Sequence, residues 1–192
     1  MRIFVFFTLV ISGCATKSVE VRTPQPELIR QCYLVANIQI KMAQSYLDGD
    51  DYSALLAKYA NNAENKQLEN FLVGEVKSIT EQKPKNAYNY GTSKYSSCVK
   101  ANGLRVQEEN VNMCLTVMLP NELAIKLQLS GKSQDEAMQI VSAHFPPDSI
   151  QYKMIRSSIE KWYLGSSQSI SDFLYSEFNQ CMQLVESRNV EN

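Results

Sequence analysis

The chain has 192 residues and a formal net charge of −1, from 19 lysines and arginines against 20 aspartates and glutamates. This balance, without a long run of one sign, argues against a nucleic-acid-binding protein, which needs a basic face. It also argues against a polybasic protein of the membrane surface. The length suits one ordinary domain or two small fused ones.

The first residues have the pattern of a secretory signal peptide. Arg2 supplies a positive charge, residues 3–11 are almost wholly apolar, and two small residues follow. An apolar run of about nine residues is too short for a hydrocarbon core that needs roughly 20 helical residues. We therefore expect residues 1–13 to be a signal peptide and not a membrane span.

The segment Ile11-Ser12-Gly13-Cys14 resembles the lipobox of bacterial lipoproteins. The resemblance implies cleavage before Cys14 and acylation of both its thiol and its new amino group. Ala15 stands where an inner-membrane retention signal usually has Asp, so the resemblance implies an outer-membrane lipoprotein. We expect it to face the periplasm, with exposure at the cell surface as the alternative. Several buried acyl chains, at about 0.8 kcal/mol per CH₂, would hold such a protein without a membrane-binding surface on its folded part.

Residues 14–26 follow as a lipidated tether. They are polar after the cysteine, contain two prolines and show no apolar period, which is typical of a linker. Removal of residues 1–13 takes away only Arg2 and leaves 18 cationic against 20 acidic side chains. The mature chain therefore stays close to neutral.

Residues 27–103 show apolar side chains at steps of three and four, which predicts helices. Gly49, within Asp48–Asp51, is expected to end the first helix in the left-handed conformation. We expect four helices in this part, over Glu27–Leu47, from Tyr52 to Asn61-Asn62, over about Ala63–Gln82 and over about Ser93–Lys100.

Residues 104–192 repeat this order. A first helix that contains Val111 and Leu127 should end at Ser130-Gly131, and Pro120 inside it predicts a kink or a restart. Ser133 and Glu136 have the spacing of a capping box and predict the start of the next helix. No stretch shows sustained strand alternation, so the predicted fold class is all-α.

The cysteines divide the chain into two similar units. Cys32 and Cys114 each lie 17 positions before a glycine, and the closing cysteine follows after 66 positions in one unit and 67 in the other. We interpret residues 27–103 and 104–192 as two pseudo-repeated four-helix units, packed as one globular body and each tied by one disulfide. The spacing favours Cys32–Cys98 with Cys114–Cys181, and the nested pairing Cys32–Cys181 with Cys98–Cys114 is the alternative.

An oxidising compartment favours these disulfides. Closing a loop of about 67 residues should stabilise the fold by roughly 4 kcal/mol on the chain-entropy model. A zinc site is the rival interpretation, but the chain has no CxxC pair and one histidine. We therefore expect no metal and no cofactor.

The sequence contains no motif that predicts a reaction. His144, the single histidine, precedes Phe145-Pro146-Pro147 near a helix end, where a partly buried or capping role is typical. Paired carboxylates could support glycoside hydrolysis, but solvated helix faces account for the possible acids Glu69, Glu75, Glu108, Glu109, Glu122 and Glu160. We expect no enzymatic activity.

Tyrosines are the candidate contact residues. The polar segment Lys83–Thr92 is broken by Pro and Gly and carries Tyr88 and Tyr90, with Tyr95 shortly after. Tyrosine combines a rigid ring with a hydroxyl group and is common in interfaces. We predict that this segment is an exposed recognition loop and that the three tyrosines contribute to partner binding, although padding of the core would also explain them.

These features favour a non-enzymatic lipoprotein whose helical body binds an envelope or periplasmic protein. One form of that function is an immunity or inhibitor protein that neutralises a toxin or hydrolase. A helical carrier of a lipid or other apolar ligand is a second alternative, and a cell-wall hydrolase is the third.

Overall fold

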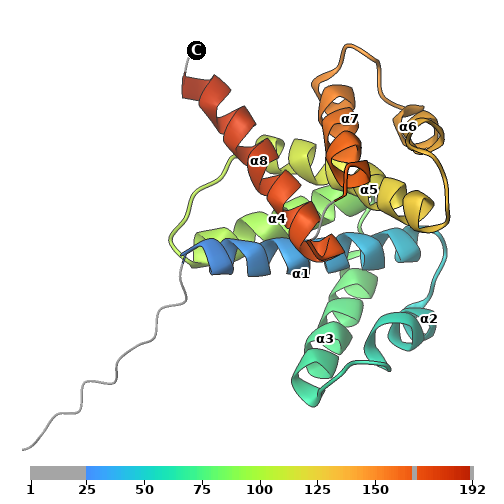
Figure 1. Cartoon of the computed structure of the whole chain (residues 1–192). Helices are drawn as coiled ribbons and strands as arrows, with labels where there is room; N and C mark the ends of the chain where they lie inside the picture. Colours follow the sequence, from blue (N-terminus) through green and yellow to red (C-terminus); the bar gives the residue numbers. More distant parts are fainter. Residues whose placement is uncertain (1–24, 166–167, 191–192) are drawn as a thin grey trace, which may run out of the picture.

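The computed structural model describes residues 25–165 and 168–190, and every regular element in these ranges is helical (Figure 1). The all-α class is confirmed. The predicted signal peptide, Cys14 and nearly all of the tether lie outside the described residues. The elements are α1 (Gln25–Leu47), α2 (Tyr52–Leu55), the π-helical turn η1 (Leu56–Ala60), α3 (Lys66–Gln82), α4 (Ala87–Ala101), α5 (Glu108–Leu129), α6 (Gln134–Ser142), α7 (Ile150–Tyr163) and α8 (Ile170–Val190).

Local sequence signals set several helix ends. Gly49 and Gly131 follow α1 and α5 with φ of +108° and +86°, a conformation in which glycine carries no Cβ penalty. The side chain of Asp51 accepts a hydrogen bond from the Ala54 N–H at 2.8 Å and caps α2. Ser133 and Glu136 form the predicted capping box at the start of α6. These boundaries are confirmed.

Two disulfides join distant helices. Cys32–Cys98 connects α1 to α4, and Cys114–Cys181 connects α5 to α8. The pairing favoured by the spacing is confirmed, and the nested pairing is wrong. Each bond joins the first and last helices of its half, because all four cysteines lie on helix faces that pack inward.

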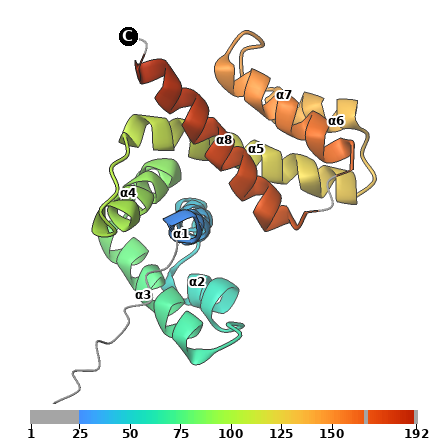
Figure 2. The same cartoon turned by 60° about the vertical axis from the view of Figure 1, so that its left-hand side comes forward.

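One hydrophobic core runs through both halves of the chain. Phe178 of α8 is fully buried, and its ring lies 4.7 Å from that of Tyr33 on α1 and 5.2 Å from that of Tyr95 on α4. Figure 2 shows α1 end-on, with α3 and α4 beside it and with α6 and α7 on the other side of α5. The two halves therefore share apolar side chains across their boundary.

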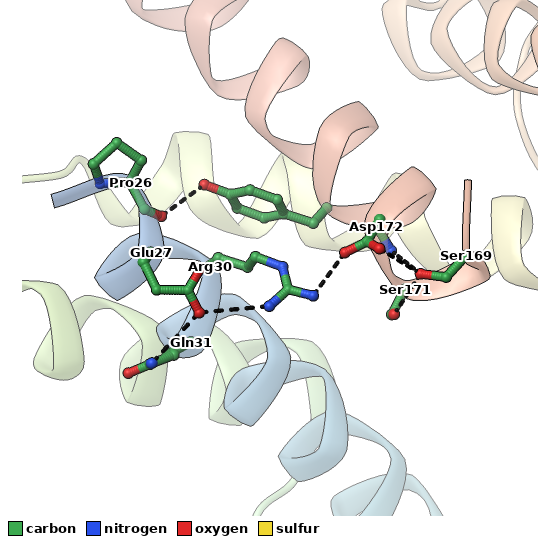
Figure 3. Close-up of polar contacts among 8 residues, drawn as sticks. Pro26, Glu27, Arg30, Gln31, Ser169, Ser171 and Asp172 are labelled. Carbon is green, nitrogen blue, oxygen red and sulfur yellow. Dashed lines mark hydrogen bonds and ion pairs between the residues drawn. The ribbon is translucent and has the colours of Figure 1, made fainter. Parts of the chain in front are cut away.

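A polar contact supplements this boundary where α1 begins. The guanidinium of Arg30 donates a hydrogen bond to Asp172 Oδ1 at 2.6 Å and lies 3.5 Å from Glu27 Oε1 (Figure 3). Tyr175 donates from its hydroxyl to the Pro26 carbonyl at 3.2 Å. The start of α1, next to the predicted tether, is thus held against the first turns of α8.

Three sequence-based expectations about residues 27–103 are wrong. The fourth helix begins at Ala87 and not near Ser93, because the side chain of Asn86 caps it by accepting from the Asn89 N–H at 2.9 Å. Lys83–Thr92 is therefore not an exposed loop, since its second half is helical and Gly91 and Thr92 are buried. The third helix likewise starts at Lys66, behind the cap Asn65.

Pro120 does not restart its helix. α5 continues through it from Glu108 to Leu129. Buried residues before and after the proline, among them Val117 and Ile125, hold both sides of the helix against the core. Tertiary packing therefore outweighs the hydrogen bond that proline cannot donate.

Candidate functional site

The three predicted contact tyrosines differ in their surroundings. Tyr90 and Tyr95 are 7% and 2% exposed, and the Tyr90 hydroxyl donates to Ser78 Oγ at 3.2 Å. The ring of Tyr88 is partly exposed and lines an open hollow beside α5. Partner binding by these residues stays a prediction, and Tyr88 is the one with a ring at the surface.

The six candidate carboxylates are spread over three helices. Glu69 and Glu160 form ion pairs within their own helices, with Lys66 and Arg156, and Glu75 lies 3.3 Å from Lys94. The other three all lie on α5, where Glu108 and Glu109 border one surface hollow and Glu122 borders a second.

These two hollows share Thr116 in their linings, and together they are called the α5 groove below. Its apolar end is an open hollow of about 650 Å³ between α4, α5 and α6. Leu119, Leu123 and Ile140 lie there with exposed fractions of 38%, 43% and 47%. The hollow is lined by Tyr88, Thr116, Leu119, Pro120, Glu122, Leu123, Lys126, Ile140, Val141, His144 and Phe145.

The other end of the α5 groove is polar. It is a hollow of about 760 Å³, and Thr116 lines both ends. The side-chain amide of Asn112 donates hydrogen bonds to Asn89 Oδ1 at 3.0 Å and to Thr92 Oγ1 at 3.2 Å. These bonds join α5 to α4 among the residues that line this hollow. This end is lined by Asn89, Thr92, Glu108, Glu109, Asn112, Met113, Thr116 and Gln151.

The charge of Glu122 is balanced at the edge of the apolar end. Its carboxylate lies 2.8 Å from Lys41 Nζ and 2.9 Å from Lys126 Nζ. Burial raises the pKa of Glu122, but hydrogen bonds from the two lysines outweigh burial, so its pKa lies below the ordinary value. The carboxylate therefore stays charged and paired at neutral pH. His144 lines the same hollow and is exposed, not partly buried as expected.

Sequence reasoning did not single out Leu119, Leu123 and Ile140. A signal for the first two exists, because apolar residues between Val111 and Leu129 occupy all sides of the helix and not one stripe. Such a helix is normally buried all round. The exposure of an apolar side of α5 to water is therefore unusual and indicates a surface for binding.

Glu177 was also missed, and it lies outside the groove. Ser158 donates from its hydroxyl to this buried carboxylate, and Lys161 Nζ lies 2.9 Å from Glu177 Oε1. These contacts join α7 to α8. They satisfy the charge of Glu177 and give it a structural role.

The described residues include no group of three or more His, Cys, Asp or Glu side chains placed to hold a metal ion. Within residues 25–165 and 168–190, no helix combines the length and the apolar character needed to cross a membrane. The chain matches no protein-family model and has no significant match among curated proteins or solved structures.

Proposed function

We propose that this chain is a non-enzymatic lipoprotein of the bacterial outer membrane that faces the periplasm. Lipid on Cys14 is its anchor, and its helical body binds an envelope or periplasmic protein through the α5 groove. The resemblance of Ile11–Cys14 to the lipobox supports the anchor. An immunity or inhibitor protein is the form of this function in which the partner is a toxin or hydrolase.

The observation that carries the binding function is the exposure of large aliphatic side chains inside a concave surface. Leu119, Leu123 and Ile140 are each more than a third exposed, and they meet around one hollow. Single exposed leucines are ordinary, but apolar side chains gathered in a groove mark interaction sites. The partly exposed ring of Tyr88 adds a contact residue to the same wall.

A duplicated scaffold is part of this proposal. Residues 27–103 and 104–192 are two copies of one four-helix unit. Two similarities support this: each half runs from a long helix through shorter elements to a helix that carries the closing cysteine, and the two disulfides span 66 and 67 positions. The α5 groove then arises on the first helix of the second copy, beside the last helix of the first.

The apolar lining also favours a second function, a carrier of a lipid or other apolar ligand. A hollow of about 650 Å³ lies in the size range of small-molecule sites. Native mass spectrometry of the purified protein distinguishes the two functions, since a carrier retains a lipid of defined mass and a protein-binding module does not.

Co-purification with a groove variant tests the protein-binding function. We expect Leu123→Asp to abolish co-purification of at least one envelope protein, because it places a charge in the apolar end. Leu129→Asp is the matched control, since Leu129 is 70% exposed on the same helix and does not line the groove. If both variants retain the same proteins as the wild type, the groove is not the binding site.

The anchor is tested separately. Inhibition of the lipoprotein signal peptidase should leave residues 1–13 attached, and Cys14→Ser should move the protein from the membrane fraction to the soluble periplasmic fraction. Processing that continues under inhibition would contradict the lipobox assignment.

A further inference from the structure

We infer that the partner segment in the α5 groove is an amphipathic α-helix that lies along α5 and places a lysine or arginine beside Glu109. This inference rests on the proposed function and specifies the chemistry of the partner.

The groove follows one face of α5. Glu109, Met113, Thr116, Pro120 and Leu123 line it, and their spacing of four, three, four and three residues places them on one side of a helix. Fourteen positions of α-helix extend over about 21 Å. A partner helix of about four turns therefore matches the length of the groove, with apolar anchors at similar intervals.

The apolar end favours a helix over an extended peptide. The three exposed aliphatic side chains of this end, Leu119, Leu123 and Ile140, offer no hydrogen bond, whereas the hydrogen-bonding groups of its lining are on Tyr88, Thr116, Glu122, Lys126 and His144. An extended peptide would bring unpaired N–H and C=O groups against this surface, which is costly. A helix satisfies its backbone internally and presents only side chains.

The polar end favours a cationic residue. Glu108 and Glu109 are exposed in the first turn of α5, and neither forms an ion pair with another described residue. Glu108 also borders a neighbouring hollow that is lined by Lys100 and Arg105. Glu109 does not border that hollow and lines only the α5 groove. Glu109 is therefore the carboxylate that we assign to the partner's lysine or arginine. An acyl chain carries no positive charge, so it could not form an ion pair with Glu109 at this polar end.

Site-specific photocrosslinking of the full-length, membrane-anchored protein in its own bacterium tests the inference. A photoreactive amino acid replaces either Met113 or Leu123, which are ten positions and about 15 Å apart along α5. Crosslinked peptides are sequenced by mass spectrometry. We expect both positions to label one partner segment, at sites about ten residues apart if the segment is helical and about four or five if it is extended.

A charge reversal tests the polar contact. We expect Glu109→Lys to lower the crosslinking yield at Leu123 by about fivefold, from the loss of an exposed ion pair and its replacement by repulsion. Glu64→Lys is the control, because Glu64 is exposed between η1 and α3, away from the groove.

The outcomes separate the inference from the function on which it rests. One protein labelled at the extended spacing, or an unchanged yield with Glu109→Lys, overturns the helical, basic partner and leaves protein binding intact. Lipid adducts, or no protein adduct at either position, overturn protein binding itself.

Discussion

At the scale of single residues, Glu122 shows how α5 combines a buried charge with an apolar groove. The residue is 8% exposed, and its carboxylate bridges Lys41 of α1 and Lys126 of α5. Removal of one member of a buried charged cluster leaves the others without partners. The contact from Lys41 also joins the two halves, so Glu122 contributes to tertiary stability as well as to the edge of the groove.

Glu122→Gln should lower the free energy of unfolding by about 1–3 kcal/mol at neutral pH. The pKa of Glu122 is lower in the folded state, so its contribution is present above the unfolded value of about 4.3 and is lost as the pH falls below it. Urea unfolding of both proteins at pH 7 and pH 3 should show a difference that shrinks in acid. Glu160→Gln removes an exposed pair with Arg156 and should change stability little at either pH. A constant difference between pH 7 and pH 3 would contradict the assigned pKa direction.

At the scale of elements, the most extensive helix contact in the described part of the chain joins α1 to α4. Cys32 bonds to Cys98, and eight residues further along α1 the side chain of Ile40 faces Gly91 of α4. The two helices therefore run antiparallel. A Cβ on Gly91 would lie 2.7 Å from Ile40 Cδ1, closer still to Ile40 Cγ1, and 3.4 Å from the Ala36 carbonyl oxygen. Only glycine allows this approach without displacement of a neighbour.

Gly91→Ala should lower the free energy of unfolding by about 1–3 kcal/mol, because it overpacks the contact between α1 and α4. Gly74→Ala is the opposite control. Gly74 is exposed inside α3, and a Cβ at this position would meet no atom within 4 Å, so alanine should stabilise the helix by about 0.5–1 kcal/mol. Thermal and urea unfolding measure both. If both variants change the free energy of unfolding by the same amount and in the same direction, steric overlap with Ile40 is not the cause of the effect of Gly91→Ala.

At the scale of the whole molecule, two covalent bonds and a shared aromatic core stabilise the two halves. Cys114 and Cys181 are both fully buried, whereas Cys98 of the other disulfide is partly exposed. Thiol–disulfide exchange requires access of the attacking thiolate to a sulfur atom. The two bonds should therefore differ in their reactivity in the native protein.

Native protein treated with a mild thiol reductant should lose Cys32–Cys98 before Cys114–Cys181. Alkylation of free thiols at successive times, followed by peptide mass spectrometry, measures the order. The same experiment under fully denaturing conditions in guanidinium chloride is the control, because exposure of all four cysteines should bring the two rates together. Simultaneous reduction without denaturant would contradict control by burial.

Local signals in the sequence are sufficient for much of the architecture. Gly49, Gly131 and the capping box at Ser133 end or begin helices through contacts within a few residues, so the sequence alone predicts them. Two matching cysteine spacings favoured the disulfide pairing that the structure has, but they left the nested pairing open. Asn86 is an equally local capping signal, but the Pro and Gly around it are typical of a loop, and the prediction for Lys83–Thr92 followed those residues instead.

The sequence by itself determined that this chain forms helices and where several of them begin or end, and it favoured the cysteine pairing that the structure has. The sequence also places apolar residues on all sides of α5, a pattern that the sequence-based prediction did not use. Only the tertiary structure decided which of those apolar residues remain exposed, because burial depends on where α4 and α6 pack against α5. The groove around Leu119 and Leu123 arises from that packing, and periodicity along one helix cannot reveal which of its sides lacks a neighbour.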